Sequence, residues 1–194
     1  TPTPRIYPML GEIPLKNWQC IAEFIDNSID SFEYGGNLSE SEIREIHVTI
    51  PTETGIVNNE PIIIQDFGLG MTKDQLEKSI KAGYSGQRVK DKLGLFGMGF
   101  NVASNRLAWK VAVWTSTKDD NKSIGVVIDR RGQSAGTFKH ELLRTDEHEF
   151  SIQGKSGTRI ELSKFKKGIN IKRSRIIREL KNVYSSSLFE RYRV

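Results

Sequence analysis

The sequence is poor in the residues that carry redox or metal chemistry. It holds one cysteine, Cys20, and three histidines among 194 residues. A single cysteine cannot form an intramolecular disulfide, and such scarcity is typical of proteins from a reducing compartment. Three histidines and one cysteine also offer no zinc-ligand spacing. We therefore expect no disulfide framework and no metal centre built from these residues. Because Cys20 lies within an apolar helical pattern, we interpret it as a small core residue.

Long apolar runs are also absent, and proline is concentrated in one place. No stretch approaches the roughly 20 apolar residues of a membrane helix, and the N-terminus lacks the basic-then-apolar order of a signal peptide. We therefore expect a soluble, cytoplasmic protein without membrane contact. Four of the six prolines lie in the first 15 residues, which favours an extended arm over residues 1–14. Residues 15–194 are long enough for one core and are interpreted as one domain.

Positive charge is in mild excess. The chain has 29 Lys and Arg against 24 Asp and Glu, a formal net charge of +5. This balance favours an anionic partner, and a nucleotide satisfies it as well as a nucleic acid does. Basic residues are frequent in 164–193, where a solvated helix face is the ordinary explanation and a nucleic-acid surface is the alternative.

Hydrophobic periodicity and turn residues predict the order of the elements. Thr72 and Gln75 form a capping-box signature at the start of one of the helices. The expected elements are helices at 16–32, 72–81, 100–106 and 171–189, strands at 46–50, 61–65, 109–115, 123–129, 136–143 and 158–162, a polar turn around Asn58 and a mobile glycine-rich loop at 83–99. Helices first and antiparallel strands later favour an α+β, two-layer α/β sandwich over a doubly wound parallel sheet.

The first helix carries a polar motif in which Glu23, Asn27 and Asp30 are spaced E-x-x-x-N-x-x-D. At roughly 100° per residue these side chains fall on one stripe, almost opposite the apolar stripe. A solvated face is the ordinary explanation for such a stripe. Asn and Asp are poor helix formers, however, so their crowding in mid-helix favours a functional site. A carboxylate can act as a base for water, and an amide oxygen one turn away can bind Mg²⁺.

The second motif follows a strand, where Asp66, Gly68 and Gly70 are spaced D-x-G-x-G. A carboxylate at the mouth of a buried strand can accept a hydrogen bond from an exocyclic amine, and glycines let the backbone approach a flat ring. An ordinary strand-to-helix turn explains the same residues about equally well. The triplet that begins at Asp66 also imitates the Mg²⁺-binding triplet of protein kinases, but the sequence lacks their catalytic loop and strand lysine.

The third motif is a glycine loop, Gly94-Leu95-Phe96-Gly97-Met98-Gly99, that runs into the next helix. Backbone amides exposed at a helix N-terminus can bind an anion. The G-x-x-G-x-G order is the reverse of the dinucleotide-binding fingerprint and lacks its strand-helix-strand setting, so a Rossmann fold is not expected. A hinge or linker is the ordinary explanation for such a loop taken alone.

Taken together, the three motifs lie on a helix, a strand end and a glycine loop in the order and at the separations of the GHKL superfamily. That superfamily includes DNA gyrase B, the ninety-kilodalton heat-shock chaperone, sensor histidine kinases and MutL. The motifs resemble its N box, its adenine-binding box and its ATP-lid glycine box, and Ser156-Gly157-Thr158 resembles its late G-T motif. The resemblance extends from Leu15 to Ser163. It implies a Bergerat fold, in which helices cover one face of a mixed β-sheet.

The resemblance also implies a role for each residue. Asp66 is expected to bind the adenine amine, Asn27 to bind Mg²⁺ and Glu23 to activate the attacking water. Gly97 and Gly99 are expected to present amides to the terminal phosphates. The other residues that the resemblance places around the nucleotide are Asp30, Gly68, Gly70, Met71, Ser85, Gly94, Phe96, Met98, Phe100 and Thr158. ATP and Mg²⁺ are the expected cofactors.

Within the superfamily, residues 82–86 and 97–100 are most similar to the chaperone-like and MORC-like branches. Those branches use lid closure and nucleotide-dependent dimerisation as a conformational switch. They complete the site with a lysine from a downstream transducer domain, which cannot be identified before Val194. The resemblance therefore implies a homodimer, a downstream transducer or effector domain, and a chain that is a fragment of a longer protein.

Three functions remain open at this point. The first is slow, Mg²⁺-dependent ATP hydrolysis by in-line attack of water on the γ-phosphorus. The second is the catalytic domain of a sensor histidine kinase, although this sequence lacks a phosphoacceptor-histidine helix. The third is a module that binds ATP without hydrolysing it and uses the nucleotide to regulate binding of DNA, chromatin or protein.

Overall fold

The computed structural model describes residues 12–34, 44–80, 99–119, 123–131, 140–144, 156–184 and 192–193, with Tyr34, 140–144 and 192–193 as backbone alone. Most of the expected N-terminal arm and most of the expected glycine-rich loop lie outside these ranges. The division into an arm and a single domain therefore stays a prediction.

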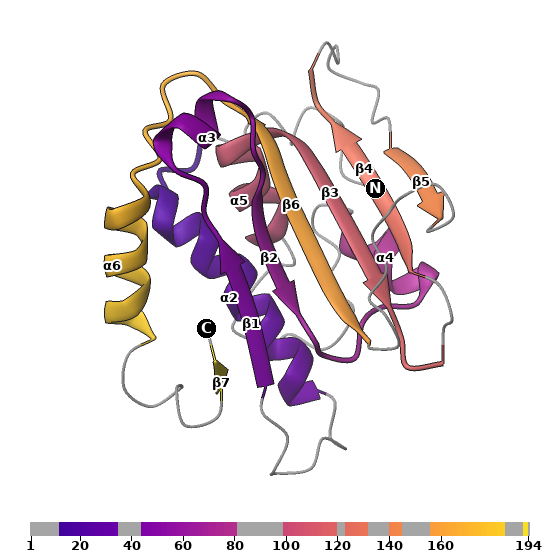
Figure 1. Ribbon diagram of the computed structural model, residues 1–194. Helices are drawn as coiled ribbons and strands as arrows, with labels where there is room; N and C mark the ends of the chain where they lie inside the picture. The colour runs from indigo at the N-terminus through magenta and orange to yellow at the C-terminus, as the bar shows by residue number, and fades with distance from the viewer. Residues whose placement is uncertain are drawn as a thin grey trace.

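Seven strands form one mixed sheet in the order β5-β4-β3-β6-β2-β1-β7 (Figure 1). All neighbouring pairs are antiparallel except β1 and β7, which are parallel. The strands are β1 (Arg44–Thr49), β2 (Ile62–Asp66), β3 (Ala108–Ser116), β4 (Ile124–Asp129), β5 (His140–Arg144), β6 (Gly157–Phe165) and β7 (Tyr192–Arg193). Six of them correspond to predicted strands, whereas the two-residue β7 was not predicted.

The helices form a second layer on one face of the sheet. Helices α2 (Asn17–Tyr34) and α5 (Gly99–Leu107) pack against each other there, and α4 (Lys73–Ser79) lies on the same side (Figure 1). Helix α6 (Arg173–Val183) packs against α2 beyond the β1 edge. This arrangement confirms the predicted α+β, two-layer sandwich.

The core lies between the two layers, and α2 is its centre. Its apolar stripe is buried at Ile21, Ala22, Ile25, Ile29 and Phe32, while Trp18 is partly buried. Phe24, which lies beside the polar motif, is also fully buried. Because side chains alternate along a strand, Ile62, Ile64 and Asp66 of β2 share one face, and all three are buried. Asp66 is therefore the polar end of an apolar row that faces the helices.

Two local predictions were wrong. The polar segment between β1 and β2 contains a short helix, α3 (Glu53–Val57), whose N-cap Thr52 accepts a hydrogen bond from the Gly55 N–H. Five residues are too few to show a helical period in the sequence. The predicted helix 171–189 is shorter in the structure, where α6 spans Arg173–Val183: its C-cap Tyr184 has left the helical conformation, with φ −102° and ψ 14°, and is only 3% exposed. The capping box at Thr72 and Gln75 is confirmed.

The expectations about Cys20 and about membranes can be compared with the described residues. Cys20 is fully buried, and burial raises the pKa of its thiol to about 12, which confirms a core residue rather than a nucleophile. Among the described helices, none is both long enough and apolar enough to cross a membrane.

Candidate functional site

The site is centred on the carboxylate of Asp66 at the end of β2. Oδ1 accepts hydrogen bonds from the backbone N–H groups of Gly68 at 3.0 Å and Thr158 at 3.2 Å. Oδ2 lies 3.0 Å from the hydroxyl of Ser28, which donates to it. A carboxylate has about four acceptor positions, so one remains for a ligand donor. Burial raises the pKa of Asp66 to about 6, while these three hydrogen bonds oppose the shift.

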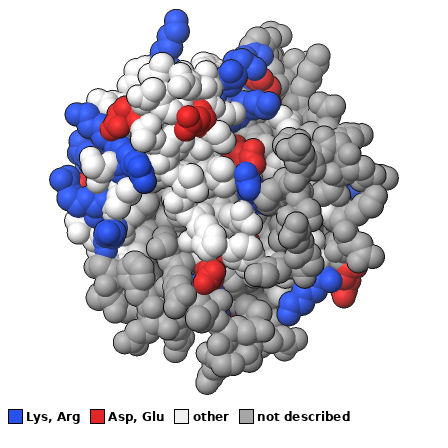
Figure 2. Space-filling view, viewed as in Figure 1, with Lys and Arg blue, Asp and Glu red and all other residues white. Residues whose placement is uncertain are grey.

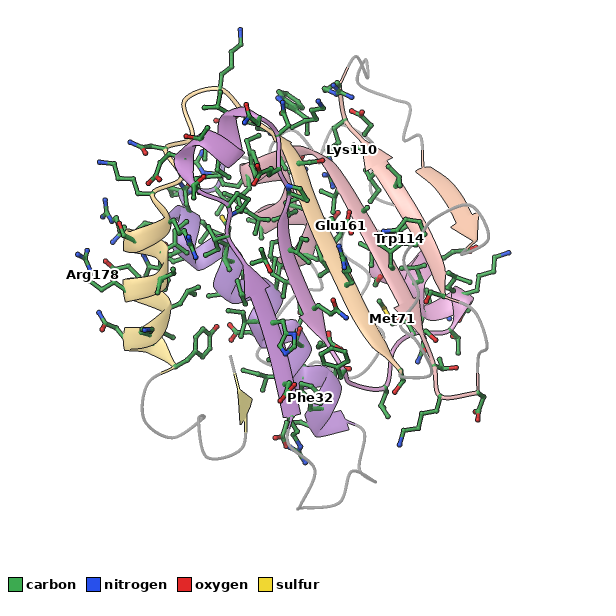
Figure 3. The ribbon with its side chains drawn as sticks, viewed as in Figure 1. Phe32, Met71, Lys110, Trp114, Glu161 and Arg178 are labelled. Atoms are coloured by element: carbon green, nitrogen blue, oxygen red, sulfur yellow. The ribbon has the colours of Figure 1, made fainter. Side chains whose placement is uncertain are left out.

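A row of polar side chains continues from Asp66 across the sheet. Asp66 pairs with Thr158 on β6, and Thr158 pairs with Thr115 on β3. The two threonine hydroxyl oxygens are 3.3 Å apart, and Thr115 donates to the carbonyl of Gly157 at 2.9 Å. Thr115 also accepts the Met71 N–H at 2.8 Å. The strand ends and the segment after β2 are thereby joined into one polar floor, beside which Met71 is labelled in Figure 3.

Gly70 is required by the path of the chain over this floor. It has φ +68°, and a Cβ atom there would lie 1.9 Å from the carbonyl oxygen of Ser116. A left-handed backbone so close to another strand accommodates only glycine. The glycine of this motif thus brings the segment after Asp66 against the end of β3.

Helix α2 is attached to the floor through Ser28. Its hydroxyl lies between Oδ2 of Asp66 and the carbonyl of Phe24, one turn earlier, at 3.0 and 3.2 Å. Ser28 is buried, whereas the neighbouring Asn27 is exposed and Asp30 is half-buried. The polar motif of α2 therefore lies along the rim of the site, with Asn27 open to solvent and Ser28 turned inward.

Glu23 meets the start of α5. A Cβ atom built on Gly99 would lie 2.2 Å from Oε2 of Glu23, so the carboxylate occupies the space that a side chain at Gly99 would fill. The rings of Phe24 and Phe100 pack edge to face beside it, with centroids 5.9 Å apart. The pKa of Glu23 is raised, first by burial and second by the negative charge of Asp26. A half-buried carboxylate with a raised pKa is a stronger base than an exposed one.

Asp26 itself is held by α6. The hydroxyl of Tyr184 donates to Oδ1 of Asp26 at 2.7 Å and lies 3.2 Å from the carbonyl oxygen of Ala22. Burial raises the pKa of Asp26, and the Tyr184 hydrogen bond partly opposes that shift. The end of α6 therefore contacts the turn of α2 that carries Glu23.

The structure brings most of the predicted residues together. They are Glu23, Asn27 and Asp30 on α2, Asp66 at the end of β2, Gly68, Gly70 and Met71 directly after it, Thr158 as the second residue of β6, and Gly99 and Phe100 at the start of α5. The remaining predicted residues lie outside the described residues; these are Ser85, Gly94, Phe96, Gly97 and Met98. Their roles stay predictions.

Sequence reasoning missed Ser28, Thr115 and Tyr184. Ser28 carried a weak signal, since a serine in mid-helix within a polar cluster is unusual. Thr115 looked like any strand threonine, and only the register between β3 and β6 reveals its place. Tyr184 contacts Asp26 across 158 positions of sequence, so no local pattern could have revealed it.

The residues fit an adenine nucleotide with Mg²⁺ better than a metal held by protein alone. Within the described ranges, no group of three or more His, Cys, Asp or Glu residues could hold a metal ion. Asn27 offers one exposed neutral oxygen at the rim, which suits an ion whose other ligands are phosphates and water. Asp66 offers the remaining acceptor position for an amine.

A two-layer α+β domain with such a carboxylate at the end of its sheet is the architecture of the GHKL ATPases. Residues 15–158 match the family model for histidine kinase-, DNA gyrase B- and HSP90-like ATPases. The match covers more than half of the chain, and the protein belongs to this family. No curated protein matches the sequence. The family is one of ATP-binding domains, and its chaperone-like and MORC-like branches are not distinguished by this match.

Proposed function

We propose that the domain binds ATP with Mg²⁺ and hydrolyses it slowly. The observation that carries the proposal is the buried Asp66 carboxylate, which accepts hydrogen bonds from Ser28, Gly68 and Thr158 and keeps one acceptor position. An ionised carboxylate is costly to bury, and three fixed donors orient it without neutralising its charge. Such a group recognises a donor such as the exocyclic amine of adenine.

The rest of the adenine end supports the same ligand. Met71 and Gly70 border the polar floor of Thr115 and Thr158, where hydroxyl groups can bind ring nitrogens directly or through water. A half-buried Met71 beside hydroxyl groups suits a flat heterocycle with an apolar face and polar edges.

At the phosphate end, Glu23 is the proposed general base. Water attacks the γ-phosphorus in line with the β,γ-bridging oxygen, a P–O bond forms to the water oxygen, and the bridging bond breaks to release ADP. Glu23 accepts the proton of the attacking water, a role that its half-buried position and raised pKa favour. Bound through Asn27 and the phosphates, Mg²⁺ supplies charge neutralisation. Gly97 and Gly99 are proposed to present amides to the terminal phosphates.

The finer part of the proposal is a switch. Glu23 lies against Gly99, at the junction of α5 and the proposed lid. A γ-phosphate that contacts both residues would couple the lid to α2, and we propose that lid closure promotes a nucleotide-dependent homodimer and signals to a downstream domain.

The test is calorimetric titration of the full chain with ATP and with a non-hydrolysable analogue in the presence of Mg²⁺, followed by a phosphate-release assay. Asp66→Asn is expected to abolish binding. Glu23→Gln is expected to keep binding and to lower hydrolysis by roughly 10²–10⁴-fold. Glu33→Gln is the matched control, because Glu33 lies on the same helix in an exposed pair with Arg44 and should change neither quantity.

The outcomes separate the candidate functions. If the native chain binds ATP but releases no phosphate, the domain is a module that ATP regulates, and the ATPase proposal fails. This conclusion holds whether or not the chain forms a dimer. If the native chain binds no adenine nucleotide, it shares only the fold of the family. Transfer of the γ-phosphate to a histidine-containing peptide would favour the histidine kinase alternative.

A further inference from the structure

A hollow lies where the N-termini of α2 and α6 meet, away from the proposed nucleotide site. Its volume is about 350 Å³. Its walls come from three segments that are distant in sequence, namely residues 14–18 before and within α2, Arg106 in the last turn of α5, and residues 170–176 at the start of α6. We call it the basic cleft. None of its lining residues belongs to the proposed nucleotide site.

The lining of the basic cleft is strongly positive. Four cationic side chains, from Lys16, Arg106, Lys172 and Arg175, border it, and among the described residues that line it there is no carboxylate. Lys16, Lys172 and Arg175 form no ion pair with any of the residues that the structure describes. Like charges that lie close together without described counter-charges repel one another, so these three side chains favour an anionic ligand.

The cleft is also held in shape. The side-chain amide of Asn17 donates to the carbonyl of Asn170 at 2.9 Å, which joins α2 to the segment before α6. Nε of Arg106 donates to the carbonyl of Leu15 at 3.3 Å, which joins α5 to the segment before α2. Three walls are therefore linked before any ligand arrives, and this lowers the entropic cost of binding.

Helix α6 adds to the positive potential. The helix has 11 residues, no acidic residue in its first turn, and an N-cap, Lys172, that makes no side-chain capping hydrogen bond. Its first backbone N–H groups thus have no side-chain acceptor at the cap and lie at the positive end of the helix dipole. This feature supports the cation cluster and does not define the site alone.

The size and shape of the cleft favour a compact ligand. About 350 Å³ is near the lower end of small-molecule sites, which span roughly 300–1,000 Å³. The other cations of α6 are Arg173, Arg178 and Lys181, and none of them lines the cleft. We call them the ridge; α6 lies at the left edge in Figure 2. Among these, Arg178 points away from the body of the protein in Figure 3. The cleft cations instead line one hollow from three segments of the chain, which suits a ligand with several closely spaced charges.

We infer that the basic cleft binds a small molecule that carries two or more phosphate groups. Each phosphate monoester brings about −1.5 to −2 charges at pH 7, so two of them can balance the charges of Lys16, Lys172 and Arg175. Trp18 and the buried Ile176 give the cleft an apolar wall for the rest of the molecule. This inference is independent of the proposed nucleotide site and of ATP hydrolysis.

The test is a calorimetric titration of the full chain with inorganic tripolyphosphate in the absence of Mg²⁺. Lys172→Gln with Arg175→Gln removes two cations from the cleft, and Arg173→Gln with Lys181→Gln removes two from the same helix outside it. Both double variants change the net charge equally. We expect the cleft variant to lose roughly tenfold or more in affinity and the ridge variant to lose less than about twofold.

Three results would overturn the inference. The native chain could fail to bind tripolyphosphate at about 1 mM, a Kd equivalent to roughly −4 kcal/mol. Both double variants could lose affinity for tripolyphosphate equally, which would indicate diffuse electrostatic attraction. If both variants then also lost equal affinity for a single-stranded oligonucleotide, the basic residues would form a nucleic-acid surface. Both could also bind like the native chain, which would place the anion elsewhere.

Discussion

The two ends of the candidate nucleotide site are built differently. At the adenine end, Asp66 and Thr158 are 4% and 9% exposed, Thr115 is fully buried, and every one of them is hydrogen-bonded within the sheet. At the phosphate end, Asn27 is exposed and Glu23 half-buried, and both lie on the surface of α2.

This difference indicates a division of labour. Recognition of a base requires donors and acceptors that are fixed before the ligand arrives, because each one left unpaired in a buried site is costly. Phosphate chemistry requires groups that can still move as charge develops and as a lid approaches. Changes at the adenine end should therefore affect folding and affinity, and changes at the phosphate end should affect turnover.

The largest expected effect is on stability, from Gly70→Ala. The added methyl group would lie 1.9 Å from the carbonyl oxygen of Ser116, at a residue with φ +68°. Backbone atoms cannot move aside as a flexible side chain can, so we expect a loss on the order of 3 kcal/mol or more in urea unfolding, with loss of nucleotide binding. Gly168→Ala is the control, because φ is +82° there but no atom lies within 4 Å. It should cost only the left-handed strain, about 1–2 kcal/mol.

Asp66→Asn should separate affinity from stability. An asparagine can keep Oδ1 on the N–H groups of Gly68 and Thr158 and turn Nδ2 toward the Ser28 hydroxyl. The fold is thus retained while the acceptor for the adenine amine is replaced by a donor. We expect no measurable ATP binding and an unliganded protein at least as stable as the native one at pH 7.

The stability gain of Asp66→Asn should depend on pH. Burial raises the pKa of Asp66 in the fold to about 6, above its ordinary value of 3.8. The protonated form is therefore favoured in the fold, and native stability falls as pH rises from about 4 through 6. The variant should show its full advantage above pH 6, at most about 3 kcal/mol, and none below pH 4. A constant advantage from pH 4 to pH 8 would contradict the assigned cause.

Much of this adenine end could be predicted from the sequence, because its signals are local. Asp66, Gly68 and Gly70 follow an apolar strand directly, and the alternation of β2 requires Asp66 to face the same side as Ile62 and Ile64. The helix, the strands and the order of these elements along the chain were predictable for the same reason, since hydrophobic period and turn residues are properties of short segments.

What could not be predicted depends on strand register and on contacts between distant segments. Thr115 reaches the site only because β3 pairs with β6 in one register, and a shift by one residue would turn it to the other face. Tyr184 follows α6 directly and contacts Asp26, a residue 158 positions away in the sequence. The basic cleft likewise combines cations from three segments, of which only the basic stretch 164–193 stands out in the sequence.

At the phosphate end, the pH dependence of hydrolysis should report on Glu23. Its pKa is raised by burial and by Asp26, so the acid limb of kcat should lie above the pH range of an ordinary carboxylate. Asp26→Asn removes the second cause and should move that limb to lower pH, with ATP affinity nearly unchanged. A pH profile measured by phosphate release checks both statements. An acid limb that persists in Glu23→Gln at the native position would assign the titration to another group.

The smallest expected effect comes from Tyr184→Phe, which keeps the buried ring and removes only its hydroxyl. The hydrogen bond from Tyr184 lowers the pKa of Asp26, so its loss raises that pKa and leaves Asp26 more often protonated. Less negative charge then acts on Glu23, and the acid limb of kcat should move slightly to lower pH, in the same direction as in Asp26→Asn. Loss of one hydrogen bond should cost about 1 kcal/mol of stability. If Tyr184 has only a structural role, the variant should lose that stability without any shift of the acid limb. The double variant Tyr184→Phe with Asp26→Asn distinguishes the two roles, because a shift transmitted through Asp26 must disappear when Asp26 is already neutral.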